Sequence, residues 1–135
     1  MRRLLKADRQ RVFQALASPE KMAKWFYGME RGKAKATCDF RVGGKYSIEM
    51  SDDDKKCVPT GEYLEIVPPA RLVFTWSIEG LVTKSKVTIE LFEKGRDTEL
   101  VLTHELPEDM HERHEHGWRN CLDHLETLLA QSAAS

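Results

Sequence analysis

The spacing of hydrophobic residues predicts a first short helix near the N-terminus. Val12, Phe13 and Leu16 recur at helical spacing. Asp8 stands just before them, and an aspartate side chain can cap a helix by accepting from its first backbone N–H groups. We therefore expect a helix from Asp8 to Ala17, preceded by a short strand at residues 3–6.

A second short helix is predicted directly after the first. Ser18 is a favoured cap, Pro19 fits the first helical position, and Glu20 adds a negative charge to the first turn. Glycine is common where helices end, so Gly28 is expected to end this one. The apolar residues that share one face of it are Met22, Trp25 and Phe26.

From about residue 33 to residue 106 the hydrophobic period changes to two, which is typical of strands. Turn-forming sequences interrupt the pattern at Gly43-Gly44, Asp52-Asp53-Asp54, Pro68-Pro69, Glu79-Gly80 and Gly95-Arg96-Asp97. These connections are too short for parallel pairs, which need a crossover of about a dozen residues or more. The pattern predicts an antiparallel meander of about six or seven strands.

A long amphipathic helix is predicted for residues 107–131, with proline and two acids in its first turn. Its apolar stripe consists of Met110, Trp118, Cys121, Leu122, Leu125, Leu128 and Leu129. Such a stripe needs a large apolar partner, which the predicted sheet provides on one face. The expected fold is α+β of the helix-grip kind. A curved antiparallel sheet wraps around the C-terminal helix, and residues 1–135 form a single domain.

Composition excludes several classes of function. The 135 residues carry 21 basic and 22 acidic side chains, a net charge of -1, so no track for a phosphate backbone is indicated and we expect no nucleic-acid partner. No apolar run suits a signal peptide or a membrane span, so a cytoplasmic location and no membrane contact are expected. Cys38, Cys57 and Cys121 are too widely spaced for a disulfide framework or a zinc site.

Several strings of the chain together resemble the activator of heat shock protein 90 ATPase homologue family, in the START-like, SRPBCC superfamily. The strings are ALASPEKMAKWF at Ala15–Phe26, FRVGGKYSIEM at Phe40–Met50, GEYLEIVPPARLVFTW at Gly61–Trp76, TELVLTH at Thr98–His104 and HEHGWRNCLDHLETLL at His114–Leu129. The resemblance implies a helix-grip fold with a cavity between the sheet and the C-terminal helix. It also implies a scaffold that is used for apolar ligands and a link to stress response, but no single activity.

The histidine-rich turn, residues 111–116, does not have the spacing of a metal site. A zinc-protease helix needs H-E-x-x-H, and here position 115 is Glu. His111, His114 and His116 diverge around the helix at 100° per residue. We therefore expect no metal and no cofactor.

The candidate ligand-binding residues are two histidines and a set of aromatic residues. His114 lies on the apolar helix stripe between Met110 and Trp118, and His104 shares a strand face with Leu100 and Leu102. Imidazoles that face an interior can orient a polar ligand group or move a proton. The aromatic candidates are Trp25, Phe26, Phe40, Tyr46, Phe74, Trp76 and Trp118. The pattern leaves open whether Tyr63 and Glu65 or Leu64 and Ile66 face inward.

The sequence as a whole favours the binding of a small apolar or amphipathic molecule in an internal cavity between sheet and helix. One alternative is a cyclase or hydratase that uses His104 and His114 as acid and base, but no catalytic set is recognisable from spacing. A second alternative is a protein-interaction domain that assists a chaperone. A monomer and a homodimer both remain compatible with the sequence.

Overall fold

The computed structural model describes residues 1–80, 82–106 and 108–133. Its strands are β1 (Arg2–Leu5), β2 (Lys33–Cys38), β3 (Lys45–Ser51), β4 (Lys56–Cys57), β5 (Thr60–Val67), β6 (Arg71–Ile78), β7 (Val82–Lys94) and β8 (Asp97–Glu105). Its helices are α1 (Arg9–Ala17), α2 (Pro19–Trp25) and α3 (Glu108–Ala133).

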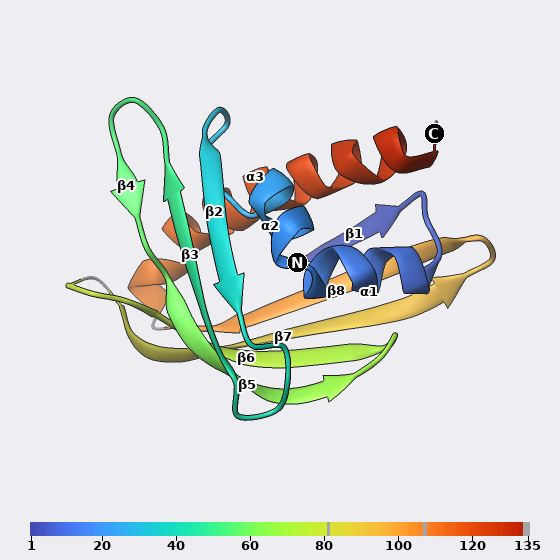
Figure 1. Ribbon diagram of the computed structural model, residues 1–135, viewed down its shortest axis with the longest axis horizontal. Coiled ribbons are helices and arrows are strands. Elements are labelled where there is room, and N and C mark those ends of the chain that lie inside the picture. The colour runs from blue at the N-terminus through green and yellow to red at the C-terminus, as the bar shows by residue number, and fades with distance from the viewer. Residues whose placement is uncertain (81, 107, 134–135) are drawn as a thin grey trace.

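The strands form one antiparallel sheet in the order β1-β8-β7-β6-β5-β3-β2, with β4 paired to β3. Figure 1 shows β2, β3 and β4 standing steeply to β6–β8, so that the sheet curves around α2 and α3. The predicted helix-grip fold is confirmed. Within the described residues the sheet has eight strands, slightly more than expected, because Lys56–Cys57 adds the short β4.

The starts of α1 and α2 follow the predicted capping. The Asp8 side chain accepts from the Arg11 backbone N–H at 2.9 Å, and the Ser18 hydroxyl accepts from the Lys21 N–H at 3.4 Å. Each cap satisfies a backbone donor that the first turn leaves without a helical partner. Pro19 is at the first position of α2, as expected.

The predicted end of α2 at Gly28 is wrong. The helix ends at Trp25, because Phe26 leaves the helical conformation with a ψ of 65°. Gly28 has a different role, since a Cβ added to it would lie 3.2 Å from the Cα of Gly117 on α3. The missing side chain lets the segment after α2 lie directly against α3, where Asn120 Nδ2 donates to the Gly28 carbonyl oxygen at 3.0 Å.

Helix α3 covers the concave face of the sheet along the predicted stripe. The residues of that stripe other than Met110 are buried: Trp118, Cys121, Leu122, Leu125, Leu128 and Leu129. Met110 is half-buried and packs against the same core. The predicted first residue of the helix, Pro107, lies outside the described residues. Burial of Cys121 also raises the pKa of its thiol, which fits the expected core role.

A β-bulge in β5 answers the open question about the facing of this strand. The register against β6 shifts between Tyr63 and Glu65. The alternation of inward and outward side chains is therefore out of phase on the two sides of the shift. Tyr63 is buried and Leu64 is 41% exposed, whereas Ile66 packs against the core. Glu65 is half-buried and pairs with Arg71 at 3.2 Å. Tyr63 and Ile66 are therefore the inward residues, one from each of the two predicted pairs.

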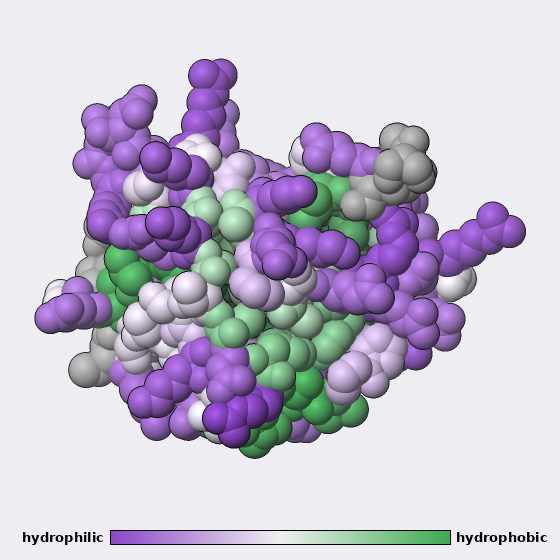
Figure 2. Space-filling view, in the orientation of Figure 1, coloured by the Kyte–Doolittle hydropathy of each residue, from purple (hydrophilic) through white to green (hydrophobic). Residues whose placement is uncertain are grey.

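Most of the face that Figure 2 shows is polar, while a band of more apolar residues crosses its middle. In the orientation of Figure 1, this band runs below the end of β2 and beside α1. Among the described residues, no helix has the length and apolar character needed to span a membrane.

Candidate functional site

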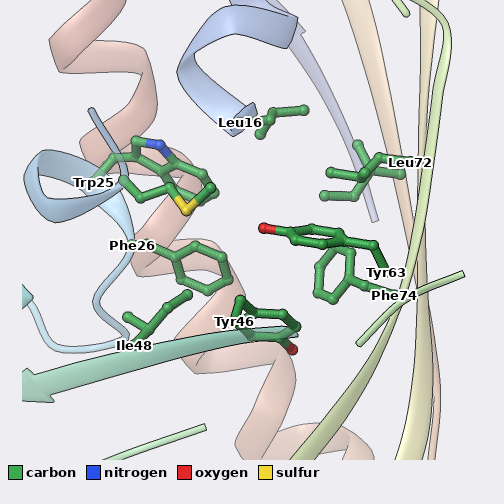
Figure 3. Close-up of a pocket in the computed structure, with 10 residues that line it drawn as sticks. Leu16, Trp25, Phe26, Tyr46, Ile48, Tyr63, Leu72 and Phe74 are labelled. Carbon is green, nitrogen blue, oxygen red and sulfur yellow. The ribbon is translucent and has the colours of Figure 1, made fainter. Parts of the chain in front are cut away.

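The space inside the core is much smaller than a ligand. A cavity of about 10 Å³ lies between α2 and the sheet, and roughly 10–15 Å³ is the least that holds one water molecule. Figure 3 shows how aromatic rings from α2, β3, β5 and β6 converge and fill this space. The residues that line it are Leu16, Met22, Trp25, Phe26, Tyr46, Ile48, Tyr63, Leu72, Phe74 and Ile89.

Six of the predicted aromatic candidates belong to this packed core. Trp25, Phe26, Tyr46 and Phe74 line the small cavity. Trp76 stacks on Phe26 with ring centroids 5.8 Å apart. The half-buried Phe40 meets the ring of Tyr63 edge-on at 4.9 Å. Such contacts stabilise a core by themselves.

A larger pocket lies between the end of β8 and the start of α3. Its volume is about 310 Å³, at the lower end of the roughly 300–1,000 Å³ range of small-molecule sites. It brings together three of the predicted site residues, His104, His114 and Trp118. The other residues that line it are Met1, Leu102, Thr103, Leu106, His111 and Glu115.

A chain of hydrogen bonds fixes His104 at the base of this pocket. Trp118 Nε1 donates to His104 Nδ1 at 3.0 Å. The Ser85 hydroxyl donates to the Trp76 carbonyl oxygen at 2.8 Å and lies 2.9 Å from His104 Nε2. Since this hydroxyl has one proton and gives it to Trp76, it must accept from Nε2–H of His104.

These partners determine the protonation of His104. An indole N–H is only a donor, so Nδ1 of His104 carries a lone pair, while Nε2 carries the single proton. His104 is therefore the neutral Nε2–H tautomer with both nitrogens engaged. A catalytic role as acid or base would require breaking one of these bonds, so the geometry favours a structural role beneath the pocket.

Ser85 is the residue of this site that the sequence analysis missed. It lies on β7 opposite Trp76 of β6, on the strand face that also carries the buried Val87 and Ile89. The signal in the sequence that could have identified Ser85 is a serine at an inward position of an otherwise apolar strand face. Its partner His104 is on β8 and 19 residues away, so only the register of β7 and β8 brings the two together.

The other two imidazoles of the pocket each donate to a backbone carbonyl of α3 or of the segment before it. His114 Nδ1 lies 3.2 Å from the Met110 oxygen, and His111 Nε2 lies 2.8 Å from the Leu106 oxygen. A carbonyl oxygen only accepts, so each of these nitrogens carries a proton. His114 is half-buried and meets His104 edge-on with ring centroids 5.3 Å apart. His116, by contrast, is exposed.

Burial, and then charge repulsion from His114 and His111, lowers the pKa of His104 from 6.5 to about 3. A histidine in the unfolded chain titrates near its ordinary value. Between these two pKa values the unfolded state therefore binds a proton that the native state does not bind. The stabilising effect of neutral His104 is complete above about pH 6.5 and is lost progressively as the pH falls toward 3.

We therefore expect His104→Gln to weaken the pH dependence of stability. Glutamine can still donate and accept a hydrogen bond but does not titrate. Urea denaturation at pH 7.5, 6 and 5 measures the free energy of unfolding, which should fall less steeply with acidification in the variant than in the wild type. Parallel pH profiles for the two proteins would contradict a neutral His104.

The described residues contain no group of three or more metal-binding side chains placed to hold a metal ion. Glu115 is the one carboxylate among the described pocket residues, and it pairs with Arg119 one turn later at 3.2 Å. The polar groups of the described pocket residues are therefore imidazoles, one ion-paired carboxylate, the Thr103 hydroxyl and the Met1 ammonium, and the other side chains are apolar.

With the fold and the pocket established, the family can be assigned. The family model described as "Activator of Hsp90 ATPase homolog 1-like protein" matches residues 6–130. The chain belongs to this family. No curated protein matches the chain.

Solved structures of similar proteins share the fold of this chain. A Chromobacterium violaceum protein is 29% identical with a TM-score of 0.81, covering 96% of this chain and 94% of its own. A Nitrosomonas europaea protein is 26% identical with a TM-score of 0.81, covering 100% and 95%. CalU16 from Micromonospora echinospora is 27% identical with a TM-score of 0.75, covering 98% and 76%. The fold is thus the SRPBCC fold that the sequence resemblance implied.

Proposed function

We propose that this chain binds a small apolar or amphipathic molecule in the pocket between β8 and the start of α3. The observation that carries the proposal is the contrast in volume between this pocket, about 310 Å³, and the packed interior, about 10 Å³. Only the pocket has room for a ligand among the spaces described above. The proposal moves the expected binding site from the middle of the core to its end.

The walls of the pocket suit such a ligand. Leu102, Leu106 and Trp118 supply apolar surface, and the imidazoles of His111 and His114 supply polar groups. Sites for small molecules commonly combine a mainly apolar wall with a few polar groups that fix the orientation. Because both nitrogens of His104 are engaged by Trp118 and Ser85, this histidine supports binding better than acid–base catalysis.

A neutral fluorescent probe provides the test. We expect N-phenyl-1-naphthylamine to bind native protein saturably, since it is apolar, and a wider side chain in the pocket to weaken its binding at least tenfold. Leu106→Trp is the variant, because Leu106 lines the pocket. Leu64→Trp is the matched control, because Leu64 is 41% exposed and does not line the pocket. Fluorescence titration measures both affinities, and thermal unfolding checks that both variants fold.

Two results would count against the proposal. One is a probe that binds only when the protein is partly unfolded. The other is equal probe affinity in wild type and Leu106→Trp. Native mass spectrometry of the freshly purified protein adds an independent readout, in which a copurified small molecule should be present in wild type and depleted in Leu106→Trp.

A further inference from the structure

We propose that Ser85 is a positioning residue of the pocket: through His104 it fixes the orientation of the Trp118 ring, and the affinity of the pocket depends on this distant hydroxyl. The inference rests on the proposed function, because it concerns ligand affinity at the same site. It is carried by three hydrogen bonds in series and by the place of Ser85 outside the pocket lining.

The Ser85 hydroxyl is anchored to the sheet rather than to the pocket. Ser85 is half-buried on β7 and is not among the residues that line the pocket. Its hydroxyl donates to the Trp76 carbonyl oxygen of β6 at 2.8 Å, which fixes the place of the hydroxyl oxygen. This oxygen can still accept, and His104 Nε2 lies 2.9 Å from it. Ser85 therefore offers His104 an acceptor whose position is set by two strands.

His104 needs this acceptor because an imidazole held at one nitrogen only can turn over. A half-turn about its χ2 angle exchanges Nδ1 with Cδ2 and Nε2 with Cε1. In the structure Ser85 holds Nε2 and Trp118 holds Nδ1, so the ring is fixed at two points. Without the hydroxyl, Nε2–H loses its acceptor, and a turned ring presents a carbon atom to the indole N–H of Trp118.

The bond to His104 gives the Trp118 ring an orientation that packing alone does not give. The ring packs against Trp76 and Phe26 with centroids 5.0 and 5.5 Å apart, but hydrophobic contacts are not directional. Trp76 cannot orient its neighbour through a hydrogen bond, since its own indole N–H is buried without a partner in the described part of the chain. The 3.0 Å bond from Trp118 Nε1 to His104 Nδ1 distinguishes the polar edge of the ring from its apolar edge.

A wall that is oriented before the ligand arrives favours binding. Ordering a side chain on binding costs free energy, and a side chain that is already ordered avoids this cost. Because the Trp118 N–H is engaged by His104, the ring presents apolar surface to the pocket, which suits the ligand proposed above. When the competent orientation is only partly populated, the apparent affinity falls by that fraction. Loss of the Ser85 hydroxyl should lower the affinity in this way.

Fluorescence titration with N-phenyl-1-naphthylamine measures the effect. We expect Ser85→Ala to bind the probe about fivefold more weakly than wild type, the size that corresponds to one hydrogen bond. Ser85→Thr keeps the hydroxyl on a residue type that suits strands, and should bind within about twofold of wild type. Thermal unfolding checks that the variants are folded at the temperature of the titration.

Ser47→Ala is the matched control. Ser47 is half-buried on β3 between the buried Tyr46 and Ile48, so its side chain points to the other face of the sheet. It does not line the pocket. The same loss of a strand hydroxyl should therefore leave the probe affinity unchanged.

Hydrogen exchange of the indole N–H groups, followed by nitrogen-15 NMR, separates positioning from a general loss of stability. Trp25 donates to the Ala15 carbonyl oxygen at 2.8 Å and serves as the internal reference. A general loss of stability accelerates exchange throughout the core, whereas local release accelerates one group. In Ser85→Ala the ratio of the Trp118 rate to the Trp25 rate should rise by at least the factor by which the affinity falls. In Ser85→Thr it should return toward the wild-type ratio.

Wild-type protein provides a test that needs no variant. If the oriented Trp118 ring favours the ligand, the ligand must favour the oriented ring by the same free energy. Saturation with N-phenyl-1-naphthylamine should therefore slow the exchange of the Trp118 N–H. An unchanged rate would mean that the probe binds equally well to both orientations, which overturns the inference even if Ser85→Ala does not fold.

The outcomes separate this inference from the proposed function. If wild type and Ser85→Ala bind the probe equally well, the positioning role is wrong and the binding pocket stands. Equal weakening in Ser85→Ala and Ser85→Thr, or in Ser47→Ala, also overturns the inference, because the Ser85 hydroxyl is then not the cause. If no probe binds native wild-type protein, the proposed function fails and the inference fails with it.

Discussion

Replacing Trp118 with alanine is expected to lower the free energy of unfolding by about 3–5 kcal/mol. The ring is 4% exposed and contacts Trp76, Phe26 and His104 with centroids 5.0, 5.5 and 6.0 Å apart. Alanine removes these contacts and leaves a cavity where α3 meets the sheet. It also removes the N–H that His104 Nδ1 accepts from, so a half-buried acceptor loses its partner.

Urea denaturation at pH 7.5 measures this loss of stability. Two further variants separate the contribution of the N–H from that of the ring and provide a control. Trp118→Phe keeps an aromatic ring but not the N–H, so its cost should be clearly smaller than that of alanine. His116→Ala, at an exposed position of the same helix, should change the free energy of unfolding by no more than about 0.5 kcal/mol. A midpoint for Trp118→Ala equal to that of wild type would show that the ring does not hold α3 against the sheet.

The sequence predicted best those elements whose residue pattern lies within one short stretch of the chain. The buried stripe of α3 follows from apolar residues spaced three and four apart, and the caps of α1 and α2 from Asp8 and Ser18. Strand number and direction follow from alternation and short turns. Most strands pair with their neighbour along the chain, as the short turns specify, but β1 pairs with β8, and β3 pairs with β5 as well as with β4.

Features that depend on register or on close packing were not readable in the same way. Whether Glu65 or Ile66 faces inward depends on a bulge against β6, and a bulge shifts alternation without leaving a distinctive sequence. The chain from Trp118 through His104 to Ser85 needs α3, β8 and β7 in their final places. Periodicity indicated that His104 faces inward, but not which groups it meets.

The volume inside the fold is a third feature that composition did not reveal. A list of inward aromatic rings fits an open cavity and a filled core equally well, because both need large apolar side chains. Here the rings of Tyr46, Tyr63 and Phe74 meet at 5.5 to 6.4 Å and fill the centre. Of the two spaces found among the described residues, the larger lies between the end of β8 and the start of α3, beside His114. The predicted site residues are thus divided between a core and a pocket.

The same close packing leads to the other large effect, at Gly61. Gly61 lies on β5 opposite Tyr46 of β3, whose hydroxyl passes over the strand to donate to the Thr75 carbonyl oxygen of β6. A Cβ on Gly61 would lie 1.9 Å from that same oxygen and 2.7 Å from Cε1 of Tyr46. A glycine within a strand often marks such an approach of neighbouring groups. The backbone of β6 cannot move away from such a Cβ without breaking hydrogen bonds of the sheet.

We therefore expect Gly61→Ala to cost about 3 kcal/mol or more, at the upper end of overpacking effects. Gly117→Ala, the same chemical change on α3, should instead stabilise the protein by about 0.5–1 kcal/mol, because glycine is a poor helix former. Its added Cβ would have its nearest described neighbour, the Gly28 Cα, at 3.9 Å, an ordinary contact. Urea denaturation of both variants measures the two shifts, and opposite signs are the expected result. Gly61→Ala as stable as wild type would mean that β3, β5 and β6 do not approach as closely as the Tyr46 hydrogen bond requires.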